Sequence, residues 1–285
     1  MSPSFSRTVA VDWSGAKGRR HKGIAIAEAR GDEAPRLVRP GHIWSRGEVF
    51  SWLWREAAKE PTLFGFDFSF APPIVDRGEY LPGEPDVPRN AREFWAYVDA
   101  RSEDEDFGAA SFLEQVHRRH FYFGAADGVK ADFMHFRQCD QQLNRMGGRK
   151  TASAYDAIGA AQVAKASFAG MRLLHWLDGD ENVAIWPMDR LRPGKSAVVE
   201  IYTRIYIRNA GLPGTKIRSR ADLNAALAAL GSAPWRGRGA LDDHKTDALI
   251  TVAGMRAHLA HPRAFSPQGL TPHIAASEGW TFGIV

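Results

Sequence analysis

The segment from Thr62 to Phe70 constrains the fold more than any other part of the chain. Its sequence, Thr-Leu-Phe-Gly-Phe-Asp-Phe-Ser-Phe, is an apolar and aromatic run containing one carboxylate, Asp67, and Pro72-Pro73 closes it. Short apolar runs bounded by chain-breaking residues are typical of buried strands. A charged and unpaired Asp67 would cost several kcal/mol in such a strand. Asp67 is therefore expected either to cap the turn before the two prolines or to lie beside a cation.

Further runs predict the rest of an α/β fold. A β-branched run over residues 8–12 ends at Asp12, just before Gly15. Further strands are expected at 23–27, 36–44, 183–186, 197–202 and 279–285, and helices at 48–59, 90–101, 109–121, 153–177, 219–230 and 242–260. The first three strands are predicted to form an antiparallel meander. The Asp67 strand, reached through a helix, should be parallel to one of them.

The middle of the chain has a different pattern from its two ends. Residues 74–150 contain Pro/Gly breaks, an acidic cluster at 103–106 and a basic and aromatic patch at 118–123. This block is predicted to be a helical insertion in a single domain spanning residues 1–285. The acidic cluster is most simply a solvated surface, and the aromatic residues at this spacing are more typical of a core than of a base-stacking patch.

Composition limits the classes of function. The chain has 285 residues, with 44% apolar and 25% charged residues, which are ordinary globular values. A single cysteine, Cys139, excludes an intramolecular disulfide framework, so we expect a reducing, cytoplasmic setting. The N-terminus has no apolar core of signal-peptide length before the first strand, no run approaches the length of a membrane span, and no membrane partner is expected. The net charge of +4 suits an anionic partner without requiring one.

Acidic residues recur where the predicted strands end. Asp12 and Asp67 end two strands, and Glu200 lies within another, in Val-Val-Glu-Ile-Tyr. The carboxyl ends of parallel neighbours share one rim, where open α/β sheets place ligands. His244 and Asp247 are three residues apart at the start of a helix, so they project from one face. We predict that these five side chains converge.

Converging carboxylates predict a bound divalent metal. Several carboxylates within a few ångströms would raise one another's pKa and destabilise the fold, and a cation removes that penalty. Mg²⁺ or Mn²⁺ prefers oxygen ligands, which this set supplies with at most one histidine. Two such ions can activate a water and stabilise the leaving oxygen in phosphodiester cleavage. The constellation is therefore interpreted as a two-metal hydrolase centre.

Each member also has a structural alternative. Asp12 can open a turn. Glu200 can pair with Arg204, four residues later, and Asp243 is a more plausible helix cap than a metal ligand. His244 by itself is more often a surface or capping residue. The joint arrangement is what favours the catalytic interpretation.

The ordered set of motifs resembles a domain-of-unknown-function family of predicted ribonuclease-H-like nucleases. The motifs are Val-Ala-Val-Asp12-Trp-Ser-Gly, Phe-Gly-Phe-Asp67-Phe-Ser, Val-Glu200-Ile-Tyr, His244-Lys-Thr-Asp247-Ala-Leu and Glu278-Gly-Trp. The His-x-x-Asp-Ala pattern is also similar to bacterial Holliday-junction resolvases of the same superfamily. The resemblance covers about residues 7–73 and 151–285.

This resemblance implies both a fold and an activity. The implied fold is a ribonuclease H-like mixed sheet of five strands in the order 3-2-1-4-5, with strand two antiparallel to the rest and helices flanking it. The implied activity is Mg²⁺-dependent cleavage of nucleic acid, with Asp12, Asp67, His244 and Asp247 as the metal-binding set. Resolvases usually carry Glu where this chain has Asp67. Two predicted strands, 183–186 and 197–202, compete for the fifth position, which leaves the role of Glu200 open.

Candidate nucleic-acid contacts are basic segments beside the predicted site elements, because a nuclease needs cations for phosphates. The residues are Lys17, Arg19, Arg20 and Lys22 after the first strand, and Arg145, Arg149 and Lys150 in a basic loop. The alternative for each segment is a solvated charged turn. DNA or RNA as substrate, and a monomer or a homodimer, both remain open.

Two rival functions use the same kind of sheet. One is an ATP-binding phosphotransferase resembling the sugar-kinase and actin-like proteins, in which the turn after Asp12 would lie beneath the phosphates. Those proteins usually carry a duplicated fold, and no second glycine-rich turn follows Asp67. The other is a non-catalytic nucleic-acid or protein-binding module. It predicts that the carboxylates do not converge or that one is displaced.

Overall fold

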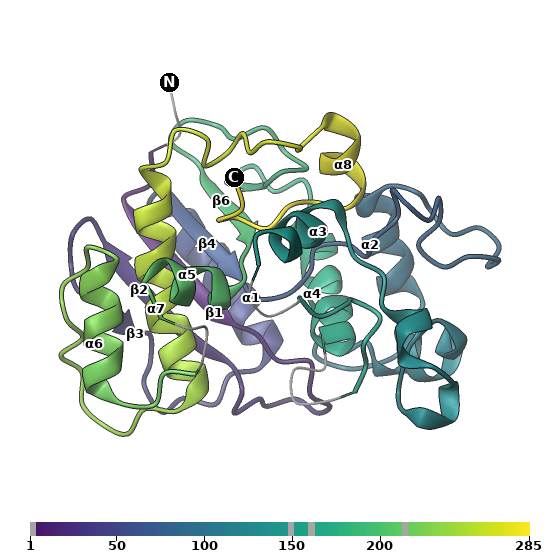
Figure 1. Ribbon diagram of the computed structural model, residues 1–285, viewed down its shortest axis with the longest axis horizontal. Helices are drawn as coiled ribbons and strands as arrows, with labels where there is room; N and C mark the ends of the chain where they lie inside the picture. Colours follow the sequence, from purple (N-terminus) through teal and green to yellow (C-terminus); the bar gives the residue numbers. More distant parts are fainter. Residues whose placement is uncertain (1–3, 148–150, 159–162, 213–215) are drawn as a thin grey trace.

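A mixed sheet of six strands organises the protein. The computed structural model describes residues 4–147, 151–158, 163–212 and 216–285 (Figure 1). The strands are β1 (Arg7–Asp12), β2 (Ala25–Arg30), β3 (Arg36–Leu37), β4 (Thr62–Phe66), β5 (Val183–Ile185) and β6 (Ser196–Glu200). Their order across the sheet is β3-β2-β1-β4-β6-β5. β2 is antiparallel to β1 and β3, whereas the β1–β4, β4–β6 and β6–β5 pairs are parallel. The chain is therefore an α/β protein.

The predicted number of five strands is wrong, because both competing segments enter the sheet. β6 takes the position beside β4, and β5, which is fully buried, adds an edge strand beyond it. The predicted strand at 36–44 is reduced to β3 and an isolated bridge between His21 and Trp44. The predicted strand at 279–285 contributes only one bridge, from Thr281 to Glu200.

Helices cover both faces of the sheet. They are α1 (Arg46–Ala57), α2 (Ala91–Ala100), α3 (Gln138–Arg145), α4 (Val163–Leu177), α5 (Thr203–Asn209), α6 (Arg220–Ala229), α7 (Asp243–Leu259) and α8 (Pro272–Ser277). α1 begins at Arg46 because Ser45 and Glu48 form a capping box. The sequence did not predict α3, α5 or α8. Within the described ranges, no helix is long and apolar enough to cross a membrane.

Two predicted helices differ from the observed chain. The helix expected at 109–121 is replaced by a π-helical turn, η1 (Phe112–Val116), and a 3₁₀ turn, η2 (Arg118–His120). Two more 3₁₀ turns, η3 (Ala125–Asp127) and η4 (Lys130–Phe133), follow. Residues 153–158 are not helical, so the helix expected at 153–177 is observed from Val163 onward.

The two faces of the sheet pack into two hydrophobic cores. Because side chains alternate along a strand, Val9 and Val11 enter the core with α1, α2 and α4, whereas Ala10 enters the core with α5, α6 and α7. In Figure 1, α6 lies at the left, α7 crosses beside β2, and α2 and α4 lie at the right of the strands. Small alanines on β1 and β2 allow α7 to lie close to the sheet.

Gly65 is needed where α7 and β6 approach the centre of the sheet. A Cβ at this position of β4 would lie 2.7 Å from both Ile201 Cγ2 and Met255 Sδ. A side chain there would force Ile201 and Met255 to repack. Gly65 therefore allows Met255 of α7 to pack directly against β4.

The block at 74–150 shares the core of the sheet, and one side chain binds it at its start and again at Gln138. Its residues Phe94 and Phe112 pack edge-on or tilted against Phe168 of α4. Glu278, which is buried, accepts hydrogen bonds from the backbone N–H groups of Ile74 (2.7 Å) and Val75 (2.8 Å) through Oε1. Its Oε2 accepts from the N–H of Gln138 at 2.8 Å. The helical-insertion interpretation of this block stays a prediction.

Candidate metal centre

The acidic residues of three strands lie at one rim of the sheet. Val11 is in register with Phe66, and Phe66 with Glu200. The N–H of Asp67 donates to the carbonyl of Val11 (3.1 Å), so Asp67 follows β4 directly beside Asp12. α7 begins near this rim because Asp242 caps it, accepting from the N–H of Lys245 at 2.9 Å. The helix then brings His244 and Asp247 toward Asp12.

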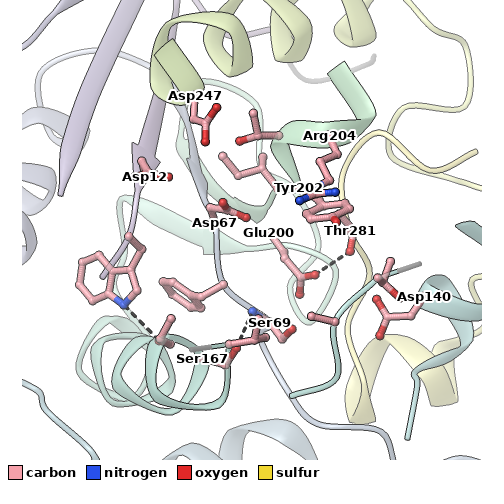
Figure 2. Close-up of a pocket in the computed structure, with 18 of the residues that line it drawn as sticks. Asp12, Asp67, Ser69, Asp140, Ser167, Glu200, Tyr202, Arg204, Asp247 and Thr281 are labelled. Carbon is pink, nitrogen blue, oxygen red and sulfur yellow. Dashed lines mark hydrogen bonds between the residues drawn. The ribbon is translucent and has the colours of Figure 1, made fainter. Parts of the chain in front are cut away.

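The residues at the rim line a cavity of about 440 Å³. Asp12, Asp67, His244, Asp247 and Glu200, all predicted from the sequence, are among the residues that line it. Figure 2 shows Asp12, Asp67 and Asp247 around one part of the cavity, and Glu200 directed toward Thr281. The predicted convergence of the five side chains on one cavity is thus observed, with Glu200 in a different setting from the others.

Asp12 and His244 form a hydrogen-bonded pair across the rim. His244 Nδ1 lies 2.6 Å from Asp12 Oδ2, and Asp12 is only 9% exposed. Burial raises the pKa of Asp12, which the bond to His244 partly offsets. The same bond raises the pKa of His244 and favours the imidazolium. Because Nδ1 is occupied, Nε2 is the ring atom that remains: as the imidazolium it donates to a substrate or a water, and it would ligate a metal only after losing its proton.

Asp67 and Asp247 have no side-chain hydrogen bond to any residue that the structure describes. Burial, followed by the charges of Asp12, Asp247 and Glu200, raises the pKa of Asp67 well above its usual value. Burial and the charge of Asp12 raise the pKa of Asp247 to about 7. Both carboxyls therefore lie in a setting that penalises their charge, which is the setting that a bound cation relieves.

The ligand atoms of the acidic side chains lie farther apart than they would around a bound metal ion. Over the described residues, no three of the five predicted side chains have ligand atoms all within 4.8 Å of one another. Like charges without a cation repel, so an open arrangement is physically expected. Three aspartates facing one cavity, two of them without a hydrogen-bond partner, nonetheless match the oxygen donors that Mg²⁺ and Mn²⁺ prefer. The residues present fit such an ion.

The predicted catalytic role of Glu200 conflicts with its contacts. Arg137 donates to both carboxylate oxygens at 2.6 Å, the hydroxyl of Thr281 donates at 2.6 Å, and the N–H of Phe70 donates at 2.8 Å. Arg137 and Glu200 are both almost fully buried. A carboxylate that accepts four hydrogen bonds has little capacity left for a metal. We therefore interpret Glu200 as an anchor of the chain after Asp67.

Two of the structural alternatives for acidic residues are also wrong. Glu200 pairs with Arg137, 63 residues away, and not with Arg204. Asp243 does not cap α7, because Asp242 does, and Asp243 pairs with Lys216 instead.

Three of the seven predicted phosphate-binding cations form ion pairs with acidic residues. Lys17 pairs with Glu114 at 2.6 Å, Arg19 pairs with Glu105, and Arg20 pairs with Glu48. Such exposed pairs are weak, but they neutralise this basic segment. Lys22 is exposed. Arg145 is at the end of α3 and donates to Gln141 at 3.4 Å, whereas Arg149 and Lys150 lie outside the described residues.

Arg204 and Lys216 line the cavity and were not predicted as substrate contacts. Arg204 is in the first turn of α5 and makes no ion pair or hydrogen bond with any described residue. Its charge lowers the pKa of Asp67 slightly. The sequence signal for Arg204 was its position four residues after Glu200, near the end of a strand. That same spacing led us to pair Arg204 with Glu200 instead of placing it at the cavity.

Comparisons of the chain with protein-family models, with curated proteins and with solved structures found no match.

The raised pKa of Asp247 predicts a pH-dependent stability. A carboxyl whose pKa is raised on folding binds its proton more tightly in the folded state, so the free energy of unfolding falls as pH rises from 3.8 to about 7. In the presence of a chelator, Asp247→Asn should therefore match the parent protein near pH 4 and exceed it in stability at pH 8. Urea denaturation at several pH values measures the difference. A difference that does not change with pH would contradict this prediction.

Proposed function

We propose that this protein is a divalent-metal-dependent nuclease with a ribonuclease H-like fold. The observation that carries the proposal is the meeting of Asp12, Asp67 and Asp247 at one cavity, with two of the carboxylates lacking hydrogen-bond partners among the described residues. The strand order and the antiparallel β2 are compatible with that fold class, apart from the added edge strand. Nucleic acid remains the proposed partner and the cytoplasm the predicted location, with a monomer or a homodimer both open.

The side chains at the cavity would divide the work of phosphodiester hydrolysis. Asp12, Asp67 and Asp247 would hold Mg²⁺ or Mn²⁺, which supplies a polarised water and stabilises negative charge on the reacting phosphate. Asp12 also orients the His244 ring through Nδ1. The imidazolium then presents Nε2–H as a proton donor toward the leaving oxygen. Arg204 and Lys216 bring positive charge to the same cavity for the substrate's phosphates.

The experiment that tests this proposal is a cleavage screen with single-stranded, duplex and branched DNA and RNA in the presence of Mg²⁺ or Mn²⁺. We expect cleavage of at least one substrate, its loss with a chelator, and its loss in Asp12→Asn. Asp32→Asn, at an exposed acid in the turn after β2, is the matched control and should retain activity. Cleavage that persists in Asp12→Asn would remove Asp12 from the mechanism.

The same screen separates the two alternatives. An ATP-binding phosphotransferase of the sugar-kinase and actin-like type would show thermal stabilisation by ATP without cleavage of nucleic acid. A non-catalytic module would bind nucleic acid without cleaving it, and its binding would not depend on Asp12. Either result would replace the nuclease proposal.

Arg204 should contribute to substrate binding more than to chemistry. A hydrogen bond to a charged group is worth about 1.5–3 kcal/mol, so Arg204→Ala should raise KM about tenfold or more while kcat changes little. The dependence of binding on salt should also weaken by about one phosphate contact. Arg208→Ala is the control, because Arg208 lies one turn further along α5 and is directed to the carbonyl of Met146. An equal effect of both variants would indicate only a general charge effect.

A further inference from the structure

A second cluster of metal-binding side chains lies outside the cavity at the sheet rim. Glu84, His117 and His120 have ligand atoms that all lie within 4.8 Å of one another. Glu84 Oε1 is 2.9 Å from His120 Nε2 and 3.8 Å from His117 Nδ1. None of the three residues lines the candidate metal centre. A metal bound by this cluster would therefore be independent of the nuclease proposal.

Local backbone geometry brings the two histidines to one side. η1 is a π-helical turn that ends with the N–H of His117 donating to the carbonyl of Phe112 at 3.0 Å. A 3₁₀ turn follows, in which residues three apart are eclipsed, so His117 and His120 project together. Glu84 reaches them from a loop, 36 residues before His120. π-helical turns of this kind occur frequently at functional sites.

His117 has an unpartnered polar atom directed into the cluster. The residue is 4% exposed, and its Nδ1 atom is buried without a hydrogen-bond partner. Its other ring nitrogen, Nε2, lies 3.1 Å from the hydroxyl of Tyr97. When Nε2–H donates to Tyr97, the Nδ1 lone pair faces Glu84. A ligating histidine that is oriented by a hydrogen bond through its second nitrogen is the usual arrangement at metal sites.

Protonation in the cluster also suits a metal. Burial lowers the pKa of His117 and of His120, which leaves both rings neutral and able to donate a lone pair. The pKa of Glu84 is lowered by His120 and Arg119, so its carboxylate is charged. Two neutral imidazoles and one carboxylate form a donor set that zinc favours, with a fourth position for water.

We propose that Glu84, His117 and His120 form a zinc-binding site that joins the loop containing Glu84 to the turns η1 and η2. Arg119 occupies part of the site in the absence of metal, since its Nε lies 2.8 Å from Glu84 Oε1 and 3.3 Å from His120 Nε2. Its side chain is 62% exposed and can leave the cluster. Zinc would replace this guanidinium as the cation beside Glu84.

The test uses Co²⁺ as a visible probe of the zinc site. The test is made in the full-length variant Asp67→Asn/Asp247→Asn, which lacks the proposed metal centre. The result therefore does not depend on whether the nuclease proposal is correct. We expect this background to bind one equivalent of Co²⁺ with the intense visible absorption of a tetrahedral site, and to lose the band on addition of Zn²⁺. Adding His117→Ala or Glu84→Gln should abolish the band. Glu84→Gln preserves the size of the side chain and covers the case in which His117→Ala fails to fold.

Two further variants sharpen the result. His273→Ala, at an exposed histidine of α8, should leave the band unchanged. Arg119→Ala removes the competing cation and should tighten Co²⁺ binding by up to about fivefold, the effect expected for an exposed ion pair. The proposal is overturned by the absence of a tetrahedral band in the background, by a band that survives Glu84→Gln, or by unchanged or weaker binding in Arg119→Ala.

Discussion

Replacing Asp67 with asparagine should reduce metal-dependent cleavage by at least about 100-fold, the usual effect of removing one electrostatic contact from an active site. The same substitution should stabilise the metal-free protein at neutral pH. Asp67 has a raised pKa because it is buried near Asp12 and Asp247, and a neutral amide removes the repulsion among the three groups. Cleavage rates and urea denaturation in a chelator, measured on the same preparations, test both effects.

Metal binding provides the internal control for this prediction. Mn²⁺ should stabilise the parent protein against urea, because an ion that binds only the folded state shifts the equilibrium toward it. Asp67→Asn should lose most of this increment, and Asp32→Asn should keep it. A variant that loses activity but is also less stable without metal would indicate that Asp67 is required for the fold and not for the metal.

Replacing Glu200 with leucine should destabilise the protein by about 3–5 kcal/mol, because it removes one of the two buried carboxylates that pair with the buried guanidinium of Arg137, the other being Asp140. The loss also releases the N–H of Phe70 and the hydroxyl of Thr281. Urea denaturation measures the change in the free energy of unfolding. Arg137→Met should have a comparable or larger effect, since it leaves the buried carboxyls of Glu200 and Asp140 without their shared partner.

A double-mutant cycle separates the ion pair from general packing. Glu200→Leu combined with Arg137→Met should cost clearly less than the sum of the two single substitutions, because neither charge is then left unpaired. Additive costs would mean that the two residues stabilise the fold independently. A small effect of Glu200→Leu alone would contradict the interpretation of Glu200 as an anchor.

Patterns within short segments of the sequence predicted β1, β4 and the start of α7. Apolar runs that end in an acid marked β1 and β4 correctly, and Asp12 and Asp67 meet because parallel strands end at one rim. The start of α7 was predicted because its capping acid and the apolar pattern are adjacent in sequence. The replacement of the 109–121 helix by π and 3₁₀ turns was not predictable in this way, because its apolar spacing is also helical.

Contacts between distant segments account for what was missed at the site. Glu200 was assigned to the metal or to Arg204, whereas its partner Arg137 comes from the poorly patterned block, 63 residues earlier. Arg204 was consequently overlooked as a cation facing the cavity. The cluster of Glu84, His117 and His120 was not predicted for the same reason, since Glu84 and His120 are 36 residues apart. Sequence spacing indicates which side chains share a helix face, but not which loops meet.

Glu278 imposes an order of events on the newly made chain. It accepts hydrogen bonds from Ile74 and Val75, which are synthesised about two hundred residues earlier, and from Gln138, which precedes it by 140 residues. While a ribosome is still translating the segment between them, the two ends of residues 74–138 have no carboxylate to hold them together. Nascent chains stalled before Glu278 should therefore be cut by protease within this block, and chains released from the ribosome should resist.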